Sequence, residues 1–135
     1  MTIDLDTTQE MARSGFLDSA PRFKTAERTE INRICNGCGA AGAKFDFVPD
    51  TIYGLYVGHA CHIHDWDYEF GFTHEDKEEA DRRMRNNLLR IIERAARDKW
   101  QYRLLKPLMR RRAQTYYDMV CMFGGPAFWA SKNSL

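Results

Sequence analysis

The residues best suited to chemistry lie in one short stretch, His62-Ile63-His64-Asp65-Trp66-Asp67-Tyr68, which follows Cys61. On a helix, the adjacent side chains of His64 and Asp65 point about 100° apart, so the imidazole can face a substrate while the carboxylate faces a nearby cation. Tyr68 lies one turn after His64 on the same face. The stretch therefore predicts an acid/base histidine beside a metal-binding carboxylate.

A glycine-rich run precedes this stretch. Cys35-Asn36-Gly37-Cys38-Gly39-Ala40-Ala41-Gly42 contains three glycines in eight residues. Such a density is unfavourable in a helix or strand, and it suits a backbone that takes unusual dihedral angles or comes close to a ligand. We expect a loop here, close to the residues that follow Cys61.

The elements that must position these residues are mainly helical. The patterns predict a helix from about Val57 to Phe70 that ends at Gly71, and a second from the N-cap Thr73 to about Lys99. A third helix is broken or started by Pro107 and ends before Gly124. Residues 1–24 are expected to be weakly structured, and Thr25–Arg33 to form a short helix with Ile31 and Ile34 facing inward. We expect the 135 residues to form a small single domain.

The turn between the first two long helices sets which residues meet. In an antiparallel pair, positions equally far from the turn lie at similar heights, so His64 comes level with Asp81. The carboxylate would then hold one imidazole nitrogen, which leaves the other free to take a proton from water. The hydroxyl of Tyr68 could reach the same carboxylate.

Three neighbouring residues are less suited to this role. Asp76 is nearer to the turn, but it would sit about 7.5 Å along the helix from the level of His64. His62 lies about 200° around the helix from His64. We expect His62 and His59 to be exposed or satisfied by backbone carbonyls.

The stretch from Cys61 to Tyr68 resembles the active-site helix of the phospholipase A2 superfamily, in which a cysteine precedes the His-Asp pair by three residues and a tyrosine follows the histidine by four. Asn36-Gly37-Cys38-Gly39 resembles the calcium loop of that superfamily, and Asp81-Arg82 resembles the Asp-Arg of its second long helix. The similarity covers roughly residues 35–89 and is closest to compact bacterial and viral members. Asp67 stands where the family has a second cysteine.

The resemblance implies Ca²⁺-dependent hydrolysis of the sn-2 acyl ester of glycerophospholipids. His64 would activate the attacking water, with Asp81 as its partner and Tyr68 beside it. Asp65 would be the side-chain ligand of Ca²⁺. Backbone carbonyls of Cys35, Gly37 and Gly39 would complete the site, and the Gly37 amide would donate to the oxyanion. Oxygen ligands of this kind suit a hard cation.

Zinc is the main alternative metal. Cys35, Cys38, Cys61 and His64 have spacings acceptable for a structural zinc site, which with a basic helix would indicate a nucleic-acid-binding module. In an oxidising compartment, Cys61 could instead pair with Cys35 or Cys38. A third possibility is a catalytically inactive phospholipase-like scaffold.

Charge is unevenly distributed along the chain. Residues 90–112 include nine basic and two acidic side chains, so this stretch carries +7 in a protein of formal net charge +1. Such a block indicates an anionic partner or a solvated helix face. We expect a phospholipid membrane surface as the partner, contacted by Arg110, Arg111, Arg112 and Trp129. No nucleic acid is expected under this interpretation.

The remaining expectations concern burial and location. Tyr116, Phe123 and Cys121 are expected in the core, and Phe128 and Trp129 at the surface. Residues 1–11 are acidic and contain no apolar run, so they do not predict a signal peptide or a membrane span. We therefore expect a soluble protein that is cytoplasmic or delivered with a particle, or secreted if a leader has been removed.

Overall fold

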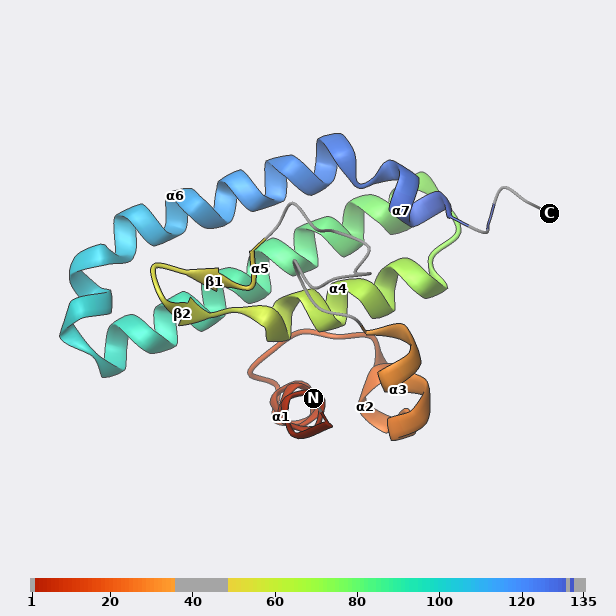
Figure 1. Ribbon diagram of the computed structural model, residues 1–135, viewed down its shortest axis with the longest axis horizontal. Helices are drawn as coiled ribbons and strands as arrows, with labels where there is room; N and C mark the ends of the chain where they lie inside the picture. The colour runs from red at the N-terminus through yellow and green to blue at the C-terminus, as the bar shows by residue number, and fades with distance from the viewer. Residues whose placement is uncertain (1, 36–48, 131, 133–135) are drawn as a thin grey trace.

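The computed structural model describes residues 2–35, 49–130 and 132, and this part of the chain is mainly helical, as predicted (Figure 1). The described residues form seven helices and one two-stranded hairpin. The elements are α1 (Thr2–Arg13), α2 (Pro21–Thr25), α3 (Arg28–Ile34), β1 (Thr51–Ile52), β2 (Leu55–Tyr56), α4 (Gly58–Phe70), α5 (His74–Asp98), α6 (Trp100–Phe123) and α7 (Gly125–Trp129).

Helices α4 and α5 lie side by side, and the chain reverses direction between them (Figure 1). The start of α5 is fixed locally. The Thr73 side chain accepts a hydrogen bond from the Asp76 amide, and the Asp76 carboxylate accepts one from the Thr73 amide. From there a stripe of buried apolar side chains faces the core: Ala80, Met84, Leu88, Ile91 and Ile92.

Helix α6 runs back along α5 and differs from the prediction at its beginning (Figure 1). It starts at Trp100, and Pro107 lies inside it without ending it. A proline removes one backbone donor, so the helix loses one hydrogen bond at this point. Burial of the inward-facing side chains offsets this loss, and these are Met109, Ala113, Tyr116 and Val120.

The expectation of a weakly structured segment over residues 1–24 is wrong. Helix α1 packs against α4, with Leu5, Thr8 and Ala12 buried. The Gln9 amide donates to the carbonyls of Phe23, Lys24 and Ala26, which holds α1 against the end of α2. The local sequence pattern did not predict α1, because the partners of these side chains lie more than ten residues away along the chain. In α3, Ile31 and Ile34 are buried as predicted.

The hairpin that leads into α4 was not predicted. Its turn places Tyr53 and Gly54 at positive φ, with values of 48° and 82°. The Tyr56 hydroxyl lies so close to Gly58 that a Cβ atom there would come within 2.1 Å of it. A larger residue at position 58 would therefore displace the Tyr56 ring from its place against the start of α4.

Across the described residues, no helix combines the length and apolar character needed to cross a bilayer.

Candidate active site

The core of the site is a hydrogen-bonded cluster around the Asp81 carboxylate. Nε2 of His64 lies 2.8 Å from Oδ1 of Asp81, and the Tyr68 hydroxyl donates to the same oxygen at 2.6 Å. The side chains of His64 and Asp81 are both almost fully buried. The structure thus brings together the three side chains that helix register predicted.

Lys77 is a member of this cluster that sequence reasoning missed. Its Nζ donates to Oδ2 of Asp81 at 2.8 Å and to the carbonyl of Val120 at 3.1 Å. Lys77 and Asp81 are four residues apart on α5, a spacing that favours contact. That spacing was a usable signal, but an ion pair of this kind is common on exposed helix faces and does not by itself mark a site.

The environment keeps Asp81 ionised. Burial raises its pKa, but the hydrogen bonds from His64, Lys77 and Tyr68 outweigh burial, so the pKa lies below its usual value. Burial, together with the negative charge of Asp81, raises the pKa of Tyr68 well above its usual value. Tyr68 therefore stays protonated and donates to the carboxylate.

An ionised Asp81 fixes the tautomer of His64. A carboxylate can only accept, so Nε2 of His64 must carry the proton that lies between them. In the neutral ring Nδ1 is then the basic nitrogen. This arrangement leaves the imidazole able to take up a proton at Nδ1 while Asp81 stabilises the resulting positive charge.

Asp65 is the candidate metal ligand on α4. Its side chain is fully buried, with 0% of the residue exposed. The described residues contain no group of three or more His, Cys, Asp or Glu side chains that could hold a metal ion. A site built from one carboxylate and backbone carbonyls would not form such a group. The expected ligands Gly37 and Gly39 lie outside the described residues.

Cys35 places the beginning of the glycine-rich run beside α4. Its thiol donates to the carbonyl of His62 at 3.2 Å, one turn from Asp65. Asp65 thus supplies a buried carboxylate oxygen on α4, and the Cys35 thiol contacts the preceding turn of the same helix. A carboxylate oxygen fits a hard cation such as Ca²⁺.

The zinc arrangement does not fit the structure. Cys61 is disulfide-bonded, whereas Cys35 and Cys121 are free thiols. A disulfide sulfur is not the thiolate that zinc requires. Nε2 of His64 is also engaged with Asp81. Cys35 does not pair with Cys61, which removes one of the two pairings considered for an oxidising compartment.

An ion pair links α4 to α5 beside the site. Nη1 of Arg83 donates to both carboxylate oxygens of Asp67, at 2.9 and 3.0 Å, and its Nε donates to Asp18. Burial raises the pKa of Asp67 to about 6, although the positive charge of Arg83 opposes this shift. Asp67 thus connects the two helices at the position where the phospholipase A2 superfamily has a cysteine.

His59 and His62 contact a side chain of α1, and His62 is buried, although it was expected to be exposed or satisfied by a backbone carbonyl. Oγ1 of Thr8 is 2.6 Å from Nδ1 of His59 and 3.0 Å from Nδ1 of His62. Thr8 therefore joins α1 to α4. Asp76, the alternative partner of His64, instead accepts hydrogen bonds from the Phe72 and Thr73 amides at the start of α5.

The four expected membrane contacts lie on two elements, α6 and α7. Arg110, Arg111 and Arg112 are exposed in the middle of α6. Arg112 lies over the Tyr53 ring, with its guanidinium carbon 5.0 Å from the ring centroid. Trp129 is half-buried at the end of α7, which follows α6, and it contacts the ring of His74. The order of residues along α6 and α7 keeps Trp129 apart from the three arginines.

Several burial expectations for the last two helices are wrong. Phe128 is 0% exposed and Phe123 is 57% exposed, which reverses the prediction. Cys121 is exposed, whereas Tyr116 is buried as predicted. Phe128 packs edge-on against Tyr68, with ring centroids 5.1 Å apart, because α7 folds back over the end of α4.

Comparisons with protein-family models, with curated proteins and with solved structures gave no match to this chain.

Proposed function

We propose that this protein is a phospholipase A2-like hydrolase that cleaves the sn-2 acyl ester of glycerophospholipids with the help of Ca²⁺. The observation that carries the proposal is the shared Asp81 oxygen, which receives hydrogen bonds from both His64 and Tyr68. The buried Asp65 follows His64 directly. In this proposal the antiparallel helices α4 and α5 carry the active site, and the glycine-rich run after Cys35 lies outside the described residues.

The side chains have distinct roles in the proposed reaction. His64 accepts a proton at Nδ1 from a water molecule, which attacks the ester carbonyl as the proton leaves. Asp81 orients the ring and stabilises the imidazolium through Nε2. Tyr68 and Lys77 touch no reacting atom, and they position the Asp81 carboxylate from two sides. When the tetrahedral intermediate collapses, His64 returns the proton to the leaving alcohol oxygen.

Asp65 and the backbone carbonyls of Cys35, Gly37 and Gly39 would hold the ion. When bound, Ca²⁺ would polarise the ester carbonyl and balance the charge that develops on its oxygen. The Gly37 amide would donate a hydrogen bond to the same oxygen.

Fatty-acid release from mixed phosphatidylcholine and phosphatidylglycerol vesicles tests the proposal, measured with Ca²⁺ and with a chelator. We expect release by the wild type only with Ca²⁺, and a loss of about 100-fold or more in His64→Ala, because general base catalysis contributes about 10²–10⁴-fold. Asp65→Asn keeps the side-chain shape but removes the charge, so it should lose the response to Ca²⁺ and keep the fold.

Two results would contradict the proposal. The first is an unchanged rate in His64→Ala, which would exclude this histidine as the base. The second is the absence of release from any vesicle by a folded wild type, and Ca²⁺ binding without turnover would then favour the inactive scaffold. Arg82→Gln is the matched control, since Arg82 is exposed on α5 next to Asp81 and should leave the rate unchanged.

A further inference from the structure

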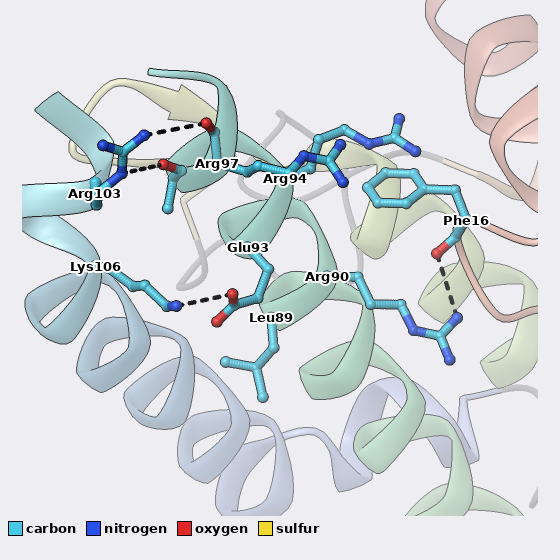
Figure 2. Close-up of a pocket in the computed structure, with 9 residues that line it drawn as sticks. Phe16, Leu89, Arg90, Glu93, Arg94, Arg97, Arg103 and Lys106 are labelled. Carbon is cyan, nitrogen blue, oxygen red and sulfur yellow. Dashed lines mark hydrogen bonds and ion pairs between the residues drawn. The ribbon is translucent and has the colours of Figure 1, made fainter. Parts of the chain in front are cut away.

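A second concave site lies at the far end of α5 from Asp81, between α5 and the first turns of α6. This α5–α6 cleft has a volume of about 620 Å³ (Figure 2). Its charged lining consists of Arg90, Arg94, Arg97, Arg103 and Lys106, with Glu93 as the one acidic residue. Five cations against one carboxylate make the cleft strongly positive, and none of them belongs to the His64–Asp81 cluster.

Three of these cations are held in place without being neutralised. Arg94 stacks on the Phe16 ring, with its guanidinium carbon 3.2 Å from the ring centroid. Arg90 donates to the carbonyl of Phe16, and Arg103 donates to the carbonyls of Ala96 and Arg97 (Figure 2). Within the described residues, none of the three pairs with a carboxylate. Their guanidinium groups are thus oriented and keep their charge, which is how arginines bind phosphate groups.

The other two cations leave room for an anion. Lys106 pairs with Glu93 at 2.9 Å, and Arg97 makes a long contact of 3.4 Å with its neighbour Asp98. Surface pairs of this kind contribute little, so an arriving phosphate can compete for both cations.

An exposed apolar stripe borders the cleft on α6. Trp100, Leu104 and Leu108 are spaced four residues apart and are 68%, 71% and 46% exposed. Arg103 lies about 60° around the helix from Trp100, so the stripe and the charged wall share an edge. Large apolar side chains next to arginines and lysines are typical of helices that lie on an anionic bilayer.

An apolar pocket of about 310 Å³ adjoins the cleft and shares Phe16 and Arg94 with it. Its other walls include Met11, Leu55 and Tyr102. A ligand with an anionic group and an apolar chain would therefore find both environments on the two sides of Arg94.

We propose that the α5–α6 cleft binds the phosphate headgroup of an anionic phospholipid at a membrane surface, with Trp100, Leu104 and Leu108 in the interface. Arg94 is thirteen residues from Asp81 along α5, or about 20 Å. Headgroup binding at this distance does not require hydrolysis and does not depend on the proposed activity. A nucleic acid would need a row of phosphate contacts along an extended track and has no use for the apolar stripe.

Vesicle co-sedimentation of the full chain, in the presence of a chelator so that no ester is cleaved, tests the proposal. The vesicles contain phosphatidylcholine alone, phosphatidylcholine with phosphatidylglycerol, or phosphatidylcholine with oleate as an anion that lacks phosphate. The test variant is Arg97→Gln/Lys106→Gln. The control is Arg33→Gln/Arg82→Gln, which removes the same charge from exposed positions outside the cleft. Thermal unfolding checks that both variants remain folded.

We expect tight binding only with phosphatidylglycerol, and about thirtyfold weaker binding in the test variant, since each cation contributes about 1 kcal/mol near an anionic bilayer. The control should bind like the wild type. Equal loss in both variants, or equal binding to oleate vesicles, would overturn the proposal, because either result reflects net charge alone. Glycerol 3-phosphate, a soluble compound with the same phosphate group, should raise the thermal unfolding temperature of the wild type only slightly.

Two further measurements, with glycerol 3-phosphate and with DNA, distinguish a phospholipid from other phosphate-containing ligands. Strong stabilisation by glycerol 3-phosphate with no vesicle binding would identify a soluble ligand and overturn the membrane assignment. Tighter binding to a short DNA duplex than to phosphatidylglycerol vesicles, lost in the test variant, would assign the cleft to nucleic acid. Trp100→Ser should weaken vesicle binding without changing the thermal stabilisation by glycerol 3-phosphate, because the indole would contact only the bilayer.

Discussion

The Asp81 carboxylate is the residue on which the candidate site depends. Three donors from two helices converge on its two oxygens: His64, Tyr68 and Lys77. A buried carboxylate is stable only when such partners compensate for the loss of water. Because both oxygens of Asp81 accept hydrogen bonds from these side chains, the geometry of the cluster is fixed before any substrate binds.

Lys77→Met tests this compensation. The methionine keeps an apolar stem but removes the donor to Oδ2 of Asp81, so we expect the free energy of unfolding at pH 7 to fall by about 1–3 kcal/mol. Urea unfolding measures this change. Arg82→Met is the control, because Arg82 is exposed on the same helix and should change stability by less than about 0.5 kcal/mol.

The same variant has a defined dependence on pH. The pKa of Asp81 in the folded protein lies below its usual value. Its partners therefore contribute stability above the unfolded pKa, about 3.9, and that contribution is lost as the pH falls through the folded pKa. The difference between wild type and Lys77→Met should be complete at pH 7 and shrink in strong acid. A difference that is constant with pH would show that Lys77 acts through packing alone.

At the scale of the elements, the α4–α5 pair is held by two kinds of contact. Apolar side chains on the inner stripe of α5 are buried in the core. The Asp67–Arg83 pair adds an orientation that apolar packing lacks, because Nη1 of Arg83 donates to both carboxylate oxygens. This pair lies two residues from Asp81, so it helps to set the height of α5 against α4.

The pair also predicts an unusual titration. Since the folded pKa of Asp67 is raised to about 6, the native state holds one more proton than the unfolded chain between about pH 4 and 6. The contribution of this group to stability therefore falls as the pH rises through that interval. Urea unfolding of the wild type should show this fall relative to Asp67→Asn, and carboxyl NMR should give a midpoint near 6. A midpoint below 4 would contradict the prediction.

How much of this could be predicted from the sequence differs between elements. The start of α5 was predictable because Thr73 and Asp76 cap it locally. The His64–Asp81 contact was predictable because helix register and one short turn determine it. The start of α6 could not be predicted in this way. The unfavourable effect of Pro107 is local, whereas the burial of Met109 and Ala113 that offsets it depends on contact with α5. The helix α1 was missed for the same reason.

At the scale of the whole molecule, both described ends of the chain close on α4. Near the N-terminus, Thr8 contacts His59 and His62. Near the C-terminus, Lys132 donates to the carbonyl of Tyr68, and the Phe128 ring packs on Tyr68. Helix α4 is thus contacted by residues near both described ends of the chain, while the α5–α6 cleft lies where the end of α5 meets the first turns of α6. The proposed hydrolysis and the proposed headgroup binding therefore involve separate regions of the molecule.

Two phenylalanines five residues apart test how the C-terminus supports the site. Phe128 is fully buried against Tyr68 and Gly71, whereas Phe123 is mostly exposed at the end of α6. Phe128→Ala should lower the free energy of unfolding by about 3–5 kcal/mol, because it leaves a cavity beside Tyr68. Phe123→Ala should change it by less than about 0.5 kcal/mol. Both values come from urea unfolding of the full chain.

The same two variants separate stability from activity. Below the unfolding transition, Phe128→Ala should also release fatty acid more slowly than Phe123→Ala, since a loosened Tyr68 no longer fixes the Asp81 carboxylate. Adding Tyr68→Phe to each variant tests this route. The added change should slow Phe123→Ala but have a smaller effect on Phe128→Ala, because the two losses share one contact. Equal effects in both backgrounds would show that α7 stabilises the fold without positioning the site.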